Sequence, residues 1–399
     1  MKVKLGDIAV LINGDRGKNY PSQADIVPDG EIPFVNAGHL NGRTICFDDM
    51  NYISQEKYGQ LNSGKFITGD ILYCLRGSLG KKAVVKGDVF GAVASSLVII
   101  RPDSERVNVD YLMYALDSPD IHEQLTRANN GSSQPNLSAA SVKAYNIDLP
   151  DKGTQGIIVE RLSKLRTIID ARQREMDCLD DLIKARFVEM FGDPVENPKG
   201  YRVDTLQSLI NAGDITYHLD GNHGGDYPRS EEFVAEGVPY IGANCISNGE
   251  IDFSLAKYLT EERAGKLRKG IAQDEDVLFA HNATVGPTVV LHTTEPKVIL
   301  STSLTAYRCN KEKIMPEYLA TFMKSDGFVM QYSNEMKQTT RNQVPITAQK
   351  KYLFLIPPMQ EQKVFSEFVK QVDKSKSVIQ KALDEDRLLF DSLMQKYFG

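Results

Sequence analysis

The chain has 399 residues, of which 41% are hydrophobic and 25% are charged, and its net charge is −6. This balance fits a folded protein of two or three domains and excludes a disordered, collagen-like or disulfide-scaffold chain. An acidic partner would have to meet a local basic patch. No stretch approaches the roughly 20 apolar residues that span a membrane, and the odd number of cysteines includes no Cys-x-x-Cys pair. We therefore expect a cytoplasmic protein.

An internal repeat is the most informative pattern in the sequence. Ile32–Val35 matches Val238–Ile241 at an offset of 206, and the same offset pairs Asp70–Tyr73 with Asp276–Phe279. After one slip the offset is 207. The later matched pairs are Ser96-Leu97 with Ser303-Leu304, Arg101 with Arg308, Tyr111-Leu112 with Tyr318-Leu319, and Leu149-Pro150 with Ile356-Pro357. A nearly constant offset over about 120 residues indicates a duplicated domain.

Each copy is rich in short β-strand patterns separated by Gly and Asp. Asp70–Leu75, Ala83–Val85 and Leu97–Arg101 are typical, and short helices are predicted at Tyr111–Leu116 and Tyr318–Lys324. The sequence therefore predicts that each copy is an α+β domain built on a curved, mostly antiparallel sheet.

A long helical pattern follows each copy. Gln155–Phe191 contains no Pro and Gln360–Phe398 contains neither Pro nor Gly, and apolar residues recur in both with a heptad spacing. Arg172 and Arg186 occupy two positions of the first seam. Each helix would be roughly 55 Å long. The residues predicted to form the seam are Leu162, Leu165, Ile169, Met176, Leu179 and Ile183 in the first helix and Phe368, Val372, Ile379, Ala382, Leu389 and Leu393 in the second.

The order of these segments predicts the domain organisation. We expect a first domain over residues 1–150, a central helix over 151–193, a second domain over 194–357 and a C-terminal helix over 358–399. The second helix must run back along the first if the two pack together. The expected architecture is therefore α+β, with two duplicated β-rich domains separated by an antiparallel coiled coil with pseudo-two-fold symmetry. The alternative is a heptad stalk that joins separate chains.

Several motifs resemble those of the specificity subunits of type I restriction–modification enzymes, and the resemblance covers essentially the whole chain. The motifs are Val3–Ile8, Ile32–Val35, Gly69–Leu72 with Arg76–Gly80, Gly131–Ser138, Ala185–Pro194 and Ile356–Gln362. The sequence departs from the pattern at Asp151–Gln155, which replaces the Pro-Pro-Met-Gln-Glu-Gln that begins the second helix. It also carries Asn282–Thr284 where the first copy has Arg76–Ser78, so base contacts cannot be transferred between the copies.

The resemblance implies a function without chemistry of its own. Each domain would act as a target-recognition domain for one half of a bipartite site in double-stranded DNA. The helices would set the separation of the half-sites and dock methyltransferase subunits. Those partners would methylate adenine, and a motor-nuclease restriction subunit would cleave. Apolar residues on the outer helix faces, such as Ile157, Ile168, Phe187 and Phe390, either bury against a partner or close the seam.

A search for catalytic patterns supports that implication. The only Pro-Pro pair, Pro357-Pro358, follows Ile356 and so lacks the Asn/Asp-Pro-Pro-aromatic motif of adenine methyltransferases. Gly59–Phe66 resembles a P-loop but has no Ser/Thr after its lysine. The loop His218–His223 could suggest a metal, yet no third ligand is spaced nearby. No His or Cys is kept in both copies. We expect no catalytic residue, no cofactor and no metal.

DNA sequence is read by bidentate side chains, chiefly Arg for guanine and Asn or Gln for adenine. Candidates lie in loops that match in place but differ in identity between the copies, as two readers of different half-sites require. In the first copy they are Arg16, Lys18, His39, Asn41, Arg76, Ser78, Lys81, Lys82, Ser133, Gln134 and Asn136. In the second copy they are Tyr217, Asn222, Asn244, Asn282, Thr284, Thr340, Arg341, Asn342 and Gln343.

Within these sets, Gln134 and Arg341 are equivalent, as are Asn136 and Gln343, and these are the strongest pairs. Lys81 and Lys82 are expected to anchor phosphates, which position a protein without specifying a base. Two other functions remain as alternatives: a stand-alone enzyme acting on nucleic acid, and a coiled-coil scaffold that binds protein or another polymer.

Overall fold

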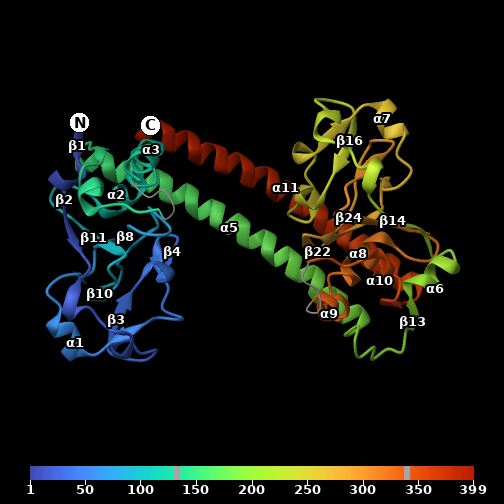
Figure 1. Ribbon diagram of the computed structural model, residues 1–399, viewed down its shortest axis with the longest axis horizontal. Helices are drawn as coiled ribbons and strands as arrows, with labels where there is room; N and C mark the ends of the chain where they lie inside the picture. Colours follow the sequence, from blue (N-terminus) through green and yellow to red (C-terminus); the bar gives the residue numbers. More distant parts are fainter. Residues whose placement is uncertain (130–134, 337–341) are drawn as a thin grey trace. The chain divides into compact units, whose positions relative to one another are not determined.

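The computed structural model describes residues 1–129, 135–336 and 342–399 and divides into two compact units. Unit 1 comprises Met1–Arg172 and Ala382–Gly399, and unit 2 comprises Gln173–Lys381. Each unit contains one copy of the repeat and part of both long helices, which are α5 (Lys152–Phe191) and α11 (Met359–Phe398) (Figure 1). The polypeptide of unit 1 is therefore discontinuous.

Unit 1 contains two four-stranded sheets and two short strand pairs. The first sheet has the order β2-β11-β8-β9, and the second has the order β6-β3-β10-β7 with β3 and β10 parallel. Strand bounds are β1 Lys2–Lys4, β2 Ala9–Asn13, β3 Ile32–Val35, β4 Leu40–Asn41, β5 Thr44–Ile45, β6 Tyr52–Ile53, β7 Lys65–Phe66, β8 Ile71–Cys74, β9 Lys82–Val84, β10 Gly91–Val93, β11 Leu97–Pro102 and β12 Asn146–Asp148. Helix bounds are α1 Gln55–Gln60, α2 Val109–Ala115, α3 Pro119–Ala128 and α4 Ala139–Lys143.

Unit 2 repeats this plan. Its sheets have the orders β14-β24-β21-β22 and β15-β19-β16-β23-β20, and β16 and β23 form the parallel pair. Strand bounds are β13 Arg202–Thr205, β14 Ile215–Asp220, β15 Phe233–Val234, β16 Val238–Ile241, β17 Ile246–Ser247, β18 Glu250–Ile251, β19 Lys257–Leu259, β20 Ile271–Ala272, β21 Val277–Asn282, β22 Thr284–Val290, β23 Val298–Leu300, β24 Leu304–Cys309 and β25 Leu353–Ile356. Helix bounds are α6 Leu206–Asn211, α7 Glu261–Gly265, α8 Pro316–Phe322, α9 Asp326–Met336 and α10 Ile346–Gln349.

The matched strands occupy matched places, so the duplication inferred from the sequence is a duplication of structure. The predicted short helices are α2 and α8. We expected one curved sheet in each copy, whereas each unit has two main sheets. The strands are only two to seven residues long and are interrupted by glycines, so that no single sheet continues through the domain.

A buried ion pair is repeated in both units with the same geometry. Arg101 Nε and Nη2 each donate to one oxygen of Asp70 at 2.8 Å, and Arg308 contacts Asp276 in the same way at 2.8 and 2.7 Å. The hydrogen bonds raise the pKa of both guanidinium groups. Both carboxylates are buried, and their bidentate pairing fixes the strand β8 or β21 against β11 or β24.

The first turn of each long helix contains a fully buried glutamine that is hydrogen-bonded to the globular domain. Gln155 donates to the carbonyls of Pro150 and Arg106 and accepts from Asn108 N. Gln362 makes the equivalent three bonds, to Pro357, Lys313 and Met315. These bonds satisfy polar groups that would otherwise be buried without partners.

Helix α5 runs from Lys152 to Phe191 and helix α11 from Met359 to Phe398. Asp151 caps the first helix, since its carboxylate accepts from Thr154 N and Thr154 Oγ1, and these bonds lower its pKa. The looser sequence at this point therefore still starts the helix at the expected place.

The two helices pack antiparallel within each unit. In unit 1, Arg161 bonds Tyr397 and Arg172 pairs with Asp386 at 3.1 Å. In unit 2, Lys376 pairs with Asp180 at 2.7 Å, and the Phe187 ring packs edge-on against Phe365. From one of these contacts to the next, the residue numbers rise along α5 and fall along α11, so the two helices run in opposite directions.

The prediction that Leu389 lies in the seam is wrong. Leu389 is 50% exposed, whereas Leu383 is buried and Phe390 packs on the core of unit 1. The actual seam passes through the charged residues Lys376 and Asp386, each paired across the helices. A heptad pattern built from apolar residues alone misses these charged positions, and the predicted register of the second helix is therefore shifted near Leu389. Of the remaining predicted seam residues, Leu162, Leu165, Met176 and Val372 are buried, and Ile169, Leu179, Ile183, Phe368, Ile379, Ala382 and Leu393 are partly buried.

Two of the four residues named for the outer helix faces follow the second of the two alternatives and pack inside the units. Phe187 lies in the core of unit 2, and Phe390 packs against Tyr114, so neither is available to a partner. Ile157 and Ile168 are about half exposed, on the outer surface of α5.

Candidate nucleic-acid interface

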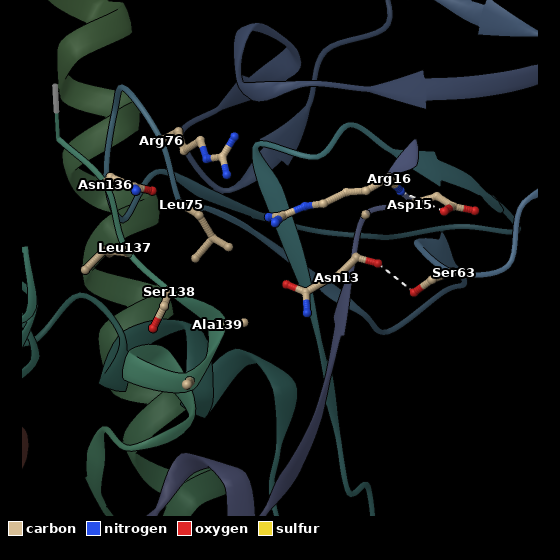
Figure 2. Close-up of a pocket in the computed structure, with 12 residues that line it drawn as sticks. Asn13, Asp15, Arg16, Ser63, Leu75, Arg76, Asn136, Leu137, Ser138 and Ala139 are labelled. Atoms are coloured by element: carbon tan, nitrogen blue, oxygen red, sulfur yellow. Dashed lines mark hydrogen bonds between the residues drawn. The ribbon is translucent and has the colours of Figure 1, made fainter. Parts of the chain in front are cut away.

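A cavity of about 580 Å³ in unit 1 collects three predicted base-reading residues. Arg16 follows β2, Arg76 follows β8, and Asn136 precedes α4. Figure 2 shows the side chains of Arg16 and Arg76 extending toward the same open space from two walls. Within the described residues neither guanidinium forms an ion pair. Two free guanidinium groups beside an exposed amide can bind the edges of bases or phosphate oxygens.

The wall that carries Arg16 depends on close backbone contact. A Cβ on Gly14 would lie 2.6 Å from Ala94 O, and one on Gly64 would lie 2.8 Å from Gly14 Cα. Asp15 is buried and accepts from Asn62 N and Arg16 N, which holds the loop at the cavity edge. Glycine is thus required where β2 ends, because the two loops meet there.

The opposite wall is a backbone bridge between two distant loops. Arg76 pairs with Asn136 in an isolated antiparallel bridge, and Leu137 N donates to Leu75 O at 2.8 Å. The bridge brings together two residues that are 60 positions apart in the sequence. It therefore presents an arginine and an asparagine side by side.

Unit 2 contains the same bridge at the equivalent positions. Asn282 pairs with Gln343, and Val344 N donates to His281 O at 2.8 Å. His223 occupies the position of Arg16, since both precede a glycine with positive φ and a 3₁₀ turn. Unit 2 therefore presents His223, Asn282 and Gln343 where unit 1 presents Arg16, Arg76 and Asn136.

The sequence analysis named the loop His218–His223 but did not predict His223 as a base-reading residue. The offset of 207 that pairs Arg101 with Arg308 would have placed it opposite Arg16. It also missed Asn13 and Ser63, which line the cavity in unit 1 and are joined by a 2.7 Å bond from Ser63 Oγ to Asn13 O. These two are polar residues in unremarkable loops, so no pattern marks them.

Lys82 cannot serve as the phosphate anchor that the sequence suggested. Its side chain is buried, and its ammonium contacts Asp117 and the carbonyl of Leu116. Burial lowers the pKa of Lys82, and the Asp117 carboxylate opposes this effect. We correct this prediction: Lys82 belongs to an internal ion pair that also includes Arg43.

Other candidates are held in structural roles. Lys81 donates to Ala37 O, and the buried His39 accepts from Asn36 N through Nδ1. Asn222 is buried and bonds Lys269 through both amide atoms, while Tyr217 OH accepts from Ile271 N. These residues shape loops and strand ends, and their polar groups are already engaged.

The remaining candidates are exposed or lie outside the described residues. Lys18, Asn41, Ser78, Asn244, Thr284 and Asn342 are exposed. Asn244 lines a second cavity of about 510 Å³ in unit 2. Ser133, Gln134, Thr340 and Arg341 fall outside the residues that the structure describes.

The described part of the chain contains neither a metal-ligand cluster nor a membrane-spanning helix. No group of three or more His, Cys, Asp or Glu side chains there is arranged to hold a metal ion. None of the helices in those residues combines the length and apolar character needed to cross a lipid bilayer.

Comparison with known proteins agrees with this architecture. The model of the type I restriction modification DNA specificity domain matches residues 1–177 and again residues 210–385. These two matches cover most of the chain, which therefore belongs to this family. It is a type I specificity subunit with a duplicated DNA recognition domain.

Individual relatives are distant, and two of them match along most of their length. The chain is 23% identical to the EcoKI specificity subunit of Escherichia coli over 96% of this chain and 85% of that protein. It is 22% identical to the StySPI specificity subunit of Salmonella potsdam over 95% and 84%. The fold is similar to that of the S subunit from M. genitalium, with a TM-score of 0.60 at 16% identity, covering 100% of this chain and 96% of that one. A solved chain of a type I R-M system gives a TM-score of 0.53 at 18% identity, with coverage of 100% and 97%.

Proposed function

We propose that the chain directs partner enzymes to a bipartite site in double-stranded DNA and has no catalytic role. Residues 1–150 would read one half-site and residues 194–357 the other, while the helical segments 151–193 and 358–399 set the spacing. The chemistry would come from methyltransferase subunits, and cleavage from a restriction subunit, in the cytoplasm. No cofactor or metal is assigned to this chain.

The observation that carries this proposal is the backbone bridge that occurs at equivalent positions in both units. The same backbone pairing joins Arg76 to Asn136 in unit 1 and Asn282 to Gln343 in unit 2. The scaffold is constant while the side chains differ, which is what two readers of different sequences need. Arg favours guanine, and Asn and Gln favour adenine, through bidentate contacts in the major groove.

The helices support the rest of the proposal. A 40-residue helix is about 60 Å long, which exceeds one turn of DNA at about 34 Å. Ile157 and Ile168 leave apolar surface exposed on α5, where a methyltransferase subunit could bury it. Gln134 and Arg341 remain candidates for base contact on sequence grounds.

The test is to map methylated adenines in cells that express the chain with its methyltransferase subunit. Arg76→Ala should relax one base pair of one half-site, by roughly 10- to 100-fold, because a bidentate pair contributes about 1–3 kcal/mol of discrimination. Asn282→Ala should act on the other half-site only. Lys86→Ala, which removes an exposed cation outside the cavity, is the control and should change neither.

Two outcomes would favour another function. Methylation or cleavage by the purified chain alone would indicate a stand-alone enzyme. Failure to bind any duplex at low salt, with and without the methyltransferase subunit, would indicate a scaffold for another polymer.

A further inference from the structure

Unit 2 contains a buried polar layer directly beneath its repeated bridge. The layer consists of His218 on β14, Thr305 and Tyr307 on β24, and Gln349 at the end of α10. All four side chains are buried. A buried polar layer costs stability wherever one of its polar atoms lacks a hydrogen-bond partner.

Gln349 is the centre of the layer. Its Oε1 accepts from His218 Nε2 at 3.0 Å and from Tyr307 OH at 2.6 Å. Its Nε2 donates to Thr305 Oγ1 at 3.2 Å and to the carbonyl of Val344 at 3.3 Å. Three side chains therefore hold the amide of Gln349, and its Nε2 also donates to the carbonyl of Val344.

Val344 follows Gln343, the residue bridged to Asn282. The carbonyl of Val344 also accepts from His281 Nδ1 at 3.0 Å, and its N–H donates to His281 O at 2.8 Å. Three hydrogen bonds thus fix this one residue, two of them from side chains. The position of Gln343 beside Asn282 depends on where Val344 is held.

Unit 1 has an apolar layer in the same place. The equivalents of His218, Thr305, Tyr307 and Gln349 at an offset of 207 are Leu11, Val98, Ile100 and Val142, and the equivalent of His281 is Leu75. Val98, Ile100, Val142 and Leu75 are buried, and Leu11 packs against them. There the bridge is held by the backbone bond from Leu137 N to Leu75 O.

The comparison shows that a sheet of this plan can be packed by an apolar layer, as it is in unit 1. The apolar version packs the equivalent sheet of unit 1, whereas in the polar version His218 Nδ1 and His281 Nε2 are buried and have no hydrogen-bond partner among the residues that the structure describes. Unpaired buried nitrogens weaken a domain. What the polar layer adds is directional: hydrogen bonds from fixed side chains restrict a backbone segment more than apolar contacts do.

We propose that Gln349, supported by His218, Tyr307 and Thr305 and acting together with His281, positions the reading edge formed by Asn282 and Gln343. These are positioning residues that do not touch DNA, and the inference rests on the proposed function. Unit 2 needs them because its reading side chains at the bridge are neutral amides, whose discrimination depends on bidentate geometry without the added attraction of a full charge.

The test uses the full chain with its methyltransferase subunit, with methylated adenines mapped genome-wide and thermal unfolding measured on the purified chain. Gln349→Val should reduce base discrimination at least tenfold at one half-site, the one that Arg76→Ala leaves unchanged. It should also lower the melting temperature. Tyr307→Phe, which removes a single hydroxyl, should reduce that discrimination two- to threefold. The matched control, Val142→Ala in unit 1, should lower stability without relaxing either half-site.

A second variant separates positioning from stability. The replacement of His218, Thr305, Tyr307 and Gln349 by Leu, Val, Ile and Val reproduces the layer of unit 1. It should restore the melting temperature that Gln349→Val loses, while discrimination at that half-site stays at least tenfold reduced. Recovery of both together, or unchanged specificity in Tyr307→Phe and in this fourfold variant, would refute positioning. A wild-type chain that yields no bipartite methylation pattern would instead refute the proposed function.

Discussion

The two units share a framework and differ at the edge that it supports. The ion pair Asp70–Arg101 recurs as Asp276–Arg308, and the buried Gln155 recurs as Gln362. The residues at the bridge and in the layer beneath it have changed almost completely. The contacts that define the fold have therefore been kept in both copies, whereas the residues at the bridge and beneath it have diverged.

This difference separates the residues that hold the fold from those that we propose to read DNA. The framework contacts join strands to strands or a helix to its domain, whereas the variable residues lie in loops or directly under them. Substitutions can therefore be chosen in equivalent pairs, one in each unit, and the two responses compared.

The largest expected effect concerns the shared ion pair. Asp70→Ala and Asp276→Ala should each destabilise their own unit by roughly 3 kcal/mol, because a buried carboxylate is lost and an arginine is left without its partner. Hydrogen exchange resolved by unit would measure both losses. Similar losses are expected in the two units. A loss in one unit more than twice that in the other would show that the two ion pairs do not contribute equally to stability.

The next largest effect is a difference between the two units in how their stability depends on pH. Burial lowers the pKa of His218 from 6.5 to about 4, and Lys350 and His281 add to this while Gln349 and Asp220 oppose it. The unfolded chain binds this proton near pH 6.5 and the folded unit only near pH 4. Unit 2 should therefore lose up to about 3 kcal/mol as the pH falls from 6.5 to 4.

Unit 1 has Leu11 at this position and should lack that component. Unit-resolved hydrogen exchange between pH 4 and 7 would detect the difference. His218→Leu should remove the component from unit 2, and persistence of the full slope in that variant would assign it to another group.

The smallest expected effect concerns a shared tyrosine. Tyr111 OH donates to Asp148 O at 2.6 Å, and Tyr318 OH donates to Leu355 O at 2.7 Å. Tyr111→Phe and Tyr318→Phe should each cost about 1 kcal/mol, since one buried carbonyl loses its partner. Denaturant unfolding would measure this. A loss in only one unit would show that the surroundings of these hydroxyls have diverged.

Much of the fold could be predicted because it follows from spacing. The constant offset located both copies, and the absence of Pro over 37 residues located α5 to within three residues of its start at Lys152. The two-sheet arrangement could not be predicted, because strands as short as Lys65–Phe66 carry no periodicity.

The site was only partly predictable because charge alone does not show what a side chain contacts. Lys82 and Arg76 look alike in sequence, yet Asp117, 35 residues after Lys82, holds the lysine inside the domain. The repeat identified Asn136 and Gln343 as equivalent, and the bridges explain why they are. The polar layer around Gln349 gave no signal, since His, Tyr and Thr also occur in ordinary strands.

The buried glutamines at the helix starts have a mechanical consequence. Three hydrogen bonds join Gln155 to its domain, and three join Gln362, at about 1 kcal/mol each. These junctions are therefore stiff rather than hinged. Torque applied to the first turn of either helix would be transmitted through these bonds to the loop that precedes α2 in unit 1 or α8 in unit 2.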